Sequence, residues 1–304
     1  DVYDVIDDAV KIRERADVEI ATLLSGGVDS SIITGLMVKH GLKPKAFTLK
    51  ADDEELSRAK RVAKLFEYDR DLQEELYQKM MAIYGEEVRL LPLTHAARLY
   101  EQISKENIKV VMSGIGADEI FYGYDGANKQ LLFSDIVKMV EFLPNSILKT
   151  FEKIFSFRAD LKLMFELAQK ENSKRKGYLY SKEAKQKGLE DFEYNTLIDF
   201  WAEKIKTNNY IDSSNWIGLM SESAHSITIS TDLPPMMYSI EARAPFLDYR
   251  VIEMAFKIDA HRKIAKKDGR ANNKLILKQA FERLIPDDIL YAKKKGFGYG
   301  IKKL

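Results

Sequence analysis

A loop with two adjacent glycines separates an apolar run from an amphipathic run near the start of the chain, with the sequence Ser25-Gly26-Gly27-Val28-Asp29-Ser30-Ser31. Residues 18–24 before it predict a buried strand, and residues 31–39 after it predict a helix. Paired glycines let backbone N–H groups approach an anion without obstruction by Cβ atoms, and hydroxyl groups at a helix N-terminus add further donors. The loop therefore favours a phosphate or pyrophosphate site; the alternative is a strand-to-helix turn capped by serine.

The acidic side chain within this loop indicates what else the site would hold. Asp29 would be repelled by a bound phosphate unless a cation lay between them, so its presence implies Mg²⁺. The loop also differs from the Walker-type phosphate loop, which has more residues between its glycines and a lysine beside its last hydroxyl. We therefore expect the nucleotide to be cleaved in a different way from that of the Walker-type enzymes.

The alternation of strand and helix continues through the first third of the chain. Further strands are predicted at residues 44–49 and 108–113, and helices at residues 54–66 and 94–105. This rhythm is typical of an α/β fold with a parallel sheet. Beyond residue 131 the pattern predicts almost no strands and a series of helices at residues 136–141, 151–167, 196–207 and 272–284. We expect a nucleotide-binding domain at residues 1–130 and a mainly helical domain at residues 131–304 that completes the active site.

The composition excludes several classes of function. The 304 residues contain no cysteine, which removes disulfides, thiolate metal sites and a cysteine nucleophile. A net charge of +1 gives no general attraction for nucleic acid. The apolar runs are too short to span a membrane, and the first residues do not resemble a signal or transit sequence. We therefore expect a cytoplasmic protein that binds neither nucleic acid nor a membrane.

Three further motifs follow the first loop. Ser113-Gly114-Ile115-Gly116-Ala117-Asp118-Glu119 ends the strand predicted at residues 108–113 with a second acidic, glycine-rich loop. Residues 241–248 have the sequence Glu-Ala-Arg-Ala-Pro-Phe-Leu-Asp, and residues 293–298 have the sequence Lys-Lys-Lys-Gly-Phe-Gly. The first loop resembles the signature of the N-type ATP pyrophosphatases. The four motifs, taken in this order over residues 25 to 298, resemble the asparagine synthetase family.

This resemblance implies an adenine nucleotide alpha-hydrolase-like domain that binds ATP and Mg²⁺, together with an additional helical domain. It assigns the phosphates to the first loop and its neighbour, namely Leu24, Ser25, Gly26, Gly27, Asp29, Ser30 and Ser31. It places adenine beside Phe47, Thr48 and Leu49, and it adds Gly114 and Lys274 to the nucleotide site. Asp29 and Asp118 are the implied Mg²⁺ ligands, since two carboxylates neutralise more of the ion's charge than one. Lys294 and Asp118 are the implied catalytic residues, with Lys294 contacting the phosphates as negative charge develops.

The resemblance also implies an AMP-forming ligase of asparagine biosynthesis. A carboxylate, for which aspartate is the favoured candidate, would attack the α-phosphorus of ATP, and ammonia would then displace AMP from the acyl-adenylate. Two alternatives stay open. The same scaffold could act on another carboxylate or amide, or the chain could be a nucleotide-binding regulatory protein with weak turnover.

Three features depart from the family pattern. Without cysteine the chain cannot hydrolyse glutamine itself, so ammonia would come from solution, from a partner subunit or from a separate glutaminase domain. Ile115 stands where the family motif Ser-Gly-Glu-Gly has a glutamate at the reaction centre, and isoleucine cannot accept a proton. The passage from Phe66 to Tyr68 is shorter than the family implies, by about one strand.

Arg243 has two interpretations at this stage. Its guanidinium group could bind an anion, or it could form a structural ion pair with Glu241 or Asp248.

Overall fold

The computed structural model describes residues 1–49, 63–66, 91–124, 127–140, 142–156, 210–220, 224–267 and 270–292. The chain divides into two compact units, each built from segments that are distant in sequence. The first unit comprises residues 1–117, 226–255 and 276–304, and the second comprises residues 118–225 and 256–275. The two domains expected from the sequence, with a boundary at residue 130, stay a prediction.

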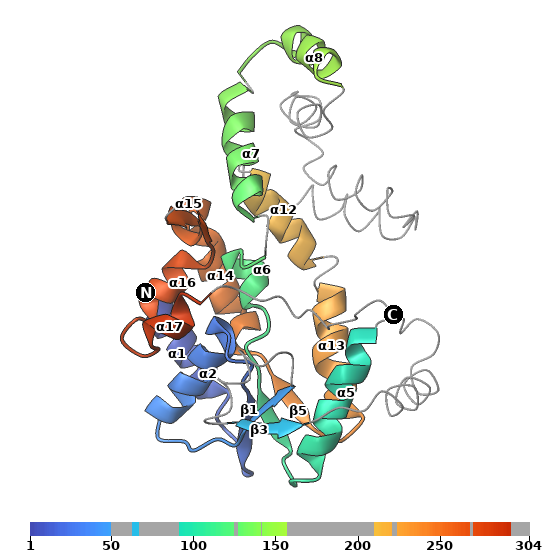
Figure 1. Ribbon diagram of the computed structural model, residues 1–304, viewed down its shortest axis with the longest axis vertical. Helices are drawn as coiled ribbons and strands as arrows, with labels where there is room; N and C mark the ends of the chain where they lie inside the picture. The colour runs from blue at the N-terminus through green and yellow to red at the C-terminus, as the bar shows by residue number, and fades with distance from the viewer. Residues whose placement is uncertain are drawn as a thin grey trace. The chain divides into compact units, whose positions relative to one another are not determined.

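A five-stranded parallel sheet forms the centre of the first unit (Figure 1). Its strands are β1 (Ile20–Leu23), β2 (Ala46–Leu49), β3 (Ala63–Phe66), β4 (Val110–Met112) and β5 (Glu241–Arg243). They are arranged in the order β3-β2-β1-β4-β5, and every neighbouring pair is parallel. The chain therefore builds outward from β1 in both directions, first to β2 and later to β4. This arrangement confirms the predicted α/β fold with a parallel sheet.

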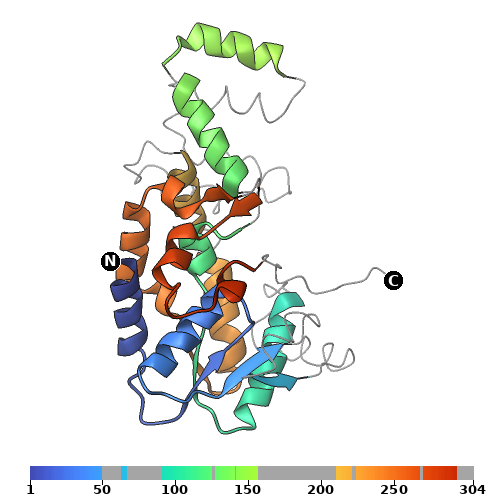
Figure 2. The same cartoon turned by 60° about the vertical axis from the view of Figure 1, so that its left-hand side comes forward.

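Helices cover both faces of this sheet (Figures 1 and 2). On one face, Ala21 and Phe47 pack against α5 (Leu91–Ser104) in a core that includes Ile103. On the other face, the Thr22 hydroxyl lies 3.0 Å from the Thr34 hydroxyl of α2 (Val28–Lys39). Neighbouring residues of a strand point to opposite faces, so β1 contacts a helix on each face of the sheet through two consecutive residues.

The first unit has further helices in the part of the chain that the structure describes. They are α1 (Val2–Ile12), α17 (Asp287–Leu290) and the 3₁₀ helix η2 (Pro245–Leu247), together with most of α13 (Ala224–Met236), α14 (Tyr249–Lys257) and α16 (Leu275–Ala280). An aspartate capping box starts α1, in which the Asp1 side chain accepts from the Asp4 N–H.

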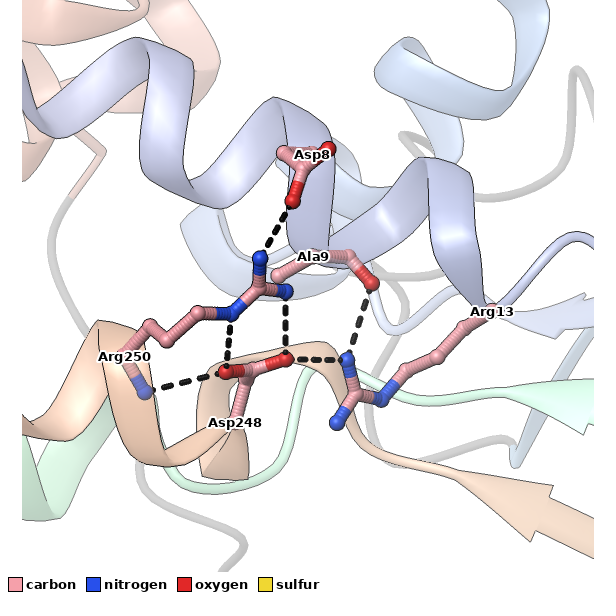
Figure 3. A network of polar contacts seen from close by, with 5 residues as sticks. All are labelled: Asp8, Ala9, Arg13, Asp248 and Arg250. Atoms are coloured by element: carbon pink, nitrogen blue, oxygen red, sulfur yellow. Dashed lines mark hydrogen bonds and ion pairs between the residues drawn. The ribbon is translucent and has the colours of Figure 1, made fainter.

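An ion-pair network connects α1 to η2 and α14 (Figure 3). The buried Asp248 carboxylate accepts from the Arg13 guanidinium at 2.7 Å and from the Arg250 guanidinium at 2.9 and 3.0 Å. Arg250 also donates to Asp8 of α1 at 2.6 Å, and Arg13 donates to the Ala9 carbonyl oxygen at 3.0 Å. The last residue of the Glu-Ala-Arg-Ala-Pro-Phe-Leu-Asp motif therefore has a structural role.

The described part of the second unit is mainly helical. Its elements are α7 (Ala127–Val140), α8 (Asn145–Ile154), α12 (Tyr210–Gly218), α15 (Ala260–Lys263), a β6 (Ala265–Lys267) and β7 (Arg270–Asn272) hairpin, and nearly all of α6 (Ala117–Phe121). A core of Tyr122, Ala127, Leu131, Ile211, Ala260 and Ile264 joins α6, α7, α12 and α15. Among the residues described here, no helix is long and apolar enough to cross a membrane.

Several predicted elements are wrong. Residues 63–66, predicted as the end of a helix, form the edge strand β3. Residues 241–243, 265–267 and 270–272 are strands in a region where almost none were expected. The helix predicted at residues 272–284 is only the six-residue α16, followed by turns. The helix predicted at residues 196–207 lies outside the described residues, as do residues 157–167 of the helix predicted at residues 151–167.

Candidate functional site

The first glycine-rich loop follows β1 directly and leads into α2. Gly26 has a φ of 79°, a conformation that glycine adopts without strain, and Gly27 is the N-cap of the helix. The Ser25 hydroxyl accepts from the Gly27 N–H at 3.3 Å and lies 3.1 Å from the Ser30 hydroxyl. In the described chain no side chain caps α2, which is 12 residues long. The turn is therefore fixed by its own serines, while the start of the helix has no side-chain cap.

The second glycine-rich loop follows β4 and contacts the first. A Cβ atom at Gly114 would lie only 2.7 Å from the Ser30 backbone nitrogen and 2.8 Å from the Asp29 carbonyl carbon. Both neighbours are backbone atoms, which cannot move aside as a flexible side chain can. Gly116 has a φ of 99°, and a Cβ atom there would overlap the Leu247 side chain. Glycine at these two positions allows the second loop to pack closely against the start of α2 and against η2.

The two loops meet where the strand order reverses. β1 pairs with β2 on one side and with β4 on the other, so the ends of β1 and β4 enclose the topological switch point of the sheet. Open parallel sheets bind their ligands outside the carboxyl ends of the strands at this point. The Ser25 and Ser113 loops therefore occupy the position in the fold that favours a ligand site.

A buried ion pair lies in the second unit. Lys274 Nζ is 2.7 Å from Asp118 Oδ1, and the exposed fractions of the two side chains are 6% and 26%. Lys274 has a φ of 58°, in the left-handed region that is costly for a lysine. Gly123 completes the arrangement, because a Cβ atom there would overlap both the Asp118 carboxylate and the Lys274 side chain. Two of the predicted site residues are thus held together in a strained and closely packed setting.

Glu119 is a buried acid next to this ion pair in the chain, and the sequence did not single it out. Burial raises the pKa of Glu119, whereas the hydrogen bond donated by the Tyr124 hydroxyl opposes the rise. Asn273 donates to the Tyr124 carbonyl oxygen at 2.8 Å, which fixes the segment that follows Gly123. Residues 118–124 have two adjacent acids followed by three aromatic residues, which was the available signal, but acids at the start of a helix are also typical of a surface helix.

The other predicted residues have varied settings. The Phe47 side chain is fully buried in the core against α5, and the Phe47 carbonyl oxygen accepts from the Leu24 N–H at 2.8 Å. A nucleotide could therefore contact Phe47 only through its backbone. Thr48 is also buried, at the carboxyl end of β2. Lys294 lies outside the described residues. The assignment of these residues to a nucleotide stays a prediction.

The residues present suit ATP and Mg²⁺ chemically. Mg²⁺ is commonly held by one or two carboxylates plus substrate phosphates, and not by a complete protein cage. Asp29 is in the first turn of α2, and Asp118 is in the first turn of α6. No group of three or more histidine, aspartate or glutamate side chains that could hold a metal occurs among the residues that the structure describes. The donor chemistry therefore fits Mg²⁺ bound together with a nucleotide, and the metal pair stays a prediction, since the two acids belong to different units.

Arg243 has a structural role. Its Nε donates to Glu241 Oε1 at 2.8 Å, and its Nη1 donates to the carbonyl oxygens of Arg13 and Arg15 at 2.6 and 2.9 Å. It lines a surface pocket of about 670 Å³, together with Asp232 and Leu247 among others. The predicted structural pair with Glu241 is confirmed.

Comparison with known proteins supports the family pattern. The model of the family described as asparagine synthase matches residues 1–304. A putative asparagine synthetase (glutamine-hydrolyzing) of Mycobacterium bovis is 26% identical over 98% of this chain and 47% of its own length. Asparagine synthetase (glutamine-hydrolyzing) 1 of Bacillus subtilis is 25% identical over 99% of this chain and 50% of its own length. The amidase chry2 of Gibberella zeae is 23% identical over 95% of this chain and 50% of its own length. The chain thus spans about half the length of these relatives.

Proposed function

Because the chain belongs to the asparagine synthase family, we propose that it is the synthetase part of an ATP-dependent, AMP-forming amide ligase. The observation that carries this proposal is the backbone contact between the loops at Gly114 and Ser30, located at the switch point of a parallel sheet. A pyrophosphate leaving group needs many donors in one place, and paired glycine-rich loops at a helix N-terminus provide them.

Activation of the carboxylate is the proposed first half-reaction. A substrate carboxylate oxygen attacks the α-phosphorus, the bond between the α-phosphorus and the bridging oxygen breaks, and pyrophosphate leaves. The first loop binds the β- and γ-phosphates through its N–H groups and the hydroxyls of Ser25, Ser30 and Ser31. Mg²⁺, when bound, neutralises the charge of the leaving group, and Asp29 and Asp118 are its proposed ligands.

Two lysines are proposed to act on the same phosphates. Lys274 is held by Asp118 at 2.7 Å, so its ammonium group has a fixed position and a compensating charge. Lys294 follows from the sequence motif alone, and its proposed role is to stabilise the charge that develops as the leaving group departs.

Attack by ammonia on the acyl-adenylate is the proposed second half-reaction, with aspartate as the favoured acyl donor. The names of the bacterial relatives include glutamine hydrolysis. This chain has no cysteine to perform it, so we propose that ammonia comes from solution or from a separate glutaminase domain or subunit. A soluble, cytoplasmic role in amino-acid biosynthesis goes with this proposal.

A second candidate function is activation of a different carboxylate or amide on the same scaffold. Ile115 favours it, because the side chain at this position cannot accept a proton from the attacking amine. The amidase-named relative is weak support for it at 23% identity.

The test is a screen of single amino acids for substrate-dependent exchange of labelled pyrophosphate into ATP, with Mg²⁺ present. Exchange reports carboxylate activation without requiring the second half-reaction. Aspartate-dependent exchange supports the first proposal, and exchange with a different carboxylate supports the second. Absence of exchange with any candidate, in a protein that binds ATP, would instead indicate the regulatory role.

A further inference from the structure

Lys263 is buried completely, although it lies in a short helix whose sequence is Ala-His-Arg-Lys. Its side chain has no exposed surface, and its Nζ has no hydrogen-bond partner in the part of the chain that the structure describes. Nζ lies 4.3 Å from the centre of the Tyr122 ring and 5.2 Å from the centre of the Phe256 ring. A lysine charge without hydrogen bonds is costly inside a protein. The two aromatic faces compensate part of this cost, together with the attraction of the Asp212 and Asp259 carboxylates.

Tyr122 is fixed from two directions. Its ring faces the Lys263 ammonium group, and its hydroxyl donates a hydrogen bond to Asp212 of α12. Tyr122 itself has a φ of 58°, an unfavourable conformation for an aromatic residue, and is almost completely buried. Such a conformation persists only when the surrounding contacts enforce it. Here the contacts are a cation on the ring and a carboxylate on the hydroxyl.

The strained Tyr122 ends the helix that carries the acidic residues. It follows α6 directly, and the next residue, Gly123, donates its N–H to the Asp118 carbonyl oxygen at 2.9 Å. Gly123 also packs against the Asp118 carboxylate and the Lys274 side chain without room for a Cβ atom. A shift of Tyr122 would therefore move the backbone that supports the pair of Asp118 and Lys274.

We propose that Lys263 is a positioning residue, whose charge holds Tyr122 and thereby keeps α6 in the arrangement in which Asp118 meets Lys274. The role of Asp118 and Lys274 in binding the nucleotide comes from the proposed function, and the rest of the proposal does not depend on it. All of these residues belong to the second unit.

The charges around Lys263 determine how it responds to pH. Burial lowers its pKa to about 8, while Asp212 of α12 and Asp259, the N-cap of α15, act in the opposite direction. The positive charge of Lys138 in α7 favours lower pKa values for both of these acids. His261 forms ion pairs with Asp259 and with Asp135. Burial raises the pKa of Tyr122, so its phenol stays neutral. Lys263 thus loses its charge as the solution becomes mildly basic. Hydrogen bonds to Asp135 and then Asp259 raise the pKa of His261, but both the native protein and a Lys263 variant contain His261, so its titration cancels in a ratio of the two.

The test measures amide hydrogen exchange in a peptide that covers residues 117–124. Lys263→Met removes the charge but keeps an unbranched side chain that can pack against aromatic rings. We expect exchange at α6 to accelerate roughly tenfold at pH 7, the factor equivalent to about 1.4 kcal/mol of lost attraction between the cation and the ring. Lys278→Met is the matched control, because Lys278 is also buried near a tyrosine ring but lies in the first unit. It should leave α6 exchange unchanged.

The pH dependence separates positioning by charge from simple packing. Between pH 7 and pH 9 the native Lys263 becomes neutral, so the ratio of exchange rates between Lys263→Met and the native protein should fall from about tenfold towards one. A ratio that stays constant over this range, unchanged exchange at α6, or equal acceleration throughout the second unit would overturn the proposal. These readouts involve no nucleotide, so they stand even if the proposed ligase activity is absent. ATP binding measured in parallel by calorimetry, weaker in Lys263→Met only, would link the effect to the site.

Discussion

Glycine residues allow close contacts within each of the two units. Gly114 brings the second loop onto the backbone of Asp29 and Ser30, Gly116 passes over Leu247, and Gly123 packs onto the pair of Asp118 and Lys274. The neighbours of Gly114 are backbone atoms, so a substitution there moves the loop that is proposed to bind the phosphates. The site is therefore sensitive to single methyl groups.

Gly114→Ala should weaken ATP binding by roughly tenfold, equivalent to about 1.4 kcal/mol, because the displaced loop loses the equivalent of one hydrogen bond to the phosphates, while the protein stays folded. Calorimetric titration with Mg·ATP checks this. Gly41→Ala is the control. Because Gly41 has a φ of 92°, an alanine there costs about 1 kcal/mol of stability, but nothing lies within 4 Å of the new Cβ atom. It should lower stability and leave binding unchanged. If Gly114→Ala and the native protein bind ATP equally well, the contact between the two loops has no part in ATP binding.

Ile115→Glu should increase amide formation without changing pyrophosphate exchange, if the proposed second half-reaction lacks only a proton acceptor. The increase should be on the order of the 10²- to 10⁴-fold supplied by one general acid–base group. Ile115→Gln, which adds polarity but no base, is the control. Efficient amide formation by the native protein would show that Ile115 is no handicap, and no amide from either variant would favour the second candidate function.

Strands that consist of a continuous apolar run were predictable from the sequence, and strands that form only by pairing with a distant segment were not. The apolar runs correctly predicted β1, β2 and β4, because their side chains are buried on both faces. β5 has three residues, Glu-Ala-Arg, which are exposed or half-buried, and it becomes a strand by pairing with β4 more than 120 positions earlier. No local pattern contains that information. The same holds for residues 63–66, where helical periodicity gave way to pairing with β2.

Asp248→Asn should loosen the attachment of α1 to η2 and α14. Hydrogen bonds from Arg250 and then Arg13 hold the pKa of Asp248 well below its usual range, against the opposing effect of burial. A depressed pKa contributes stability above the unfolded value near 4, and this contribution is lost as the pH falls towards the folded value. We expect the free energy of unfolding of the variant, measured in urea at pH 7, to be about 3 kcal/mol lower than that of the native protein.

The difference between the variant and the native protein should then shrink as the pH is lowered from 5 to 2. Asp17→Asn is the control, since Asp17 is an exposed acid with no ion pair among the described residues. A difference that does not depend on pH would mean that Asp248 acts through packing and not through its charge.

The whole chain combines a sequence-visible phosphate loop with contacts that only the fold brings together. The four motifs could be found in the sequence because each is short and contiguous. The group of Lys263 and Tyr122 could not, because 140 residues separate its members and the segment Ala-His-Arg-Lys is typical of an exposed basic turn. Burial of a lysine against two aromatic rings follows from the assembly of the second unit. It was therefore invisible to any pattern of composition or period.

Lys263→Met should raise the global stability of the protein at pH 7 even though it loosens α6. The folded pKa of Lys263, about 8, is below its ordinary value of 10.5, so the charged form costs stability. As the pH rises from about 8 to 10.5, the native protein loses this cost, and its free energy of unfolding should approach that of the variant. The gap at pH 7 should be roughly 3 kcal/mol in urea unfolding. A variant that is less stable than the native protein at pH 7 would contradict this account of the buried charge.

A carboxylate oxygen that attacks the α-phosphorus of ATP is carried away with AMP, so following that oxygen tests the proposed reaction directly. The protein is incubated with Mg·ATP, ammonia and the carboxylate substrate labelled with ¹⁸O in its carboxylate group, and the nucleotide products are analysed by mass spectrometry. We expect AMP that carries one ¹⁸O atom, formed together with pyrophosphate and in proportion to the amide. ADP and phosphate, or AMP without ¹⁸O, would contradict the proposed reaction.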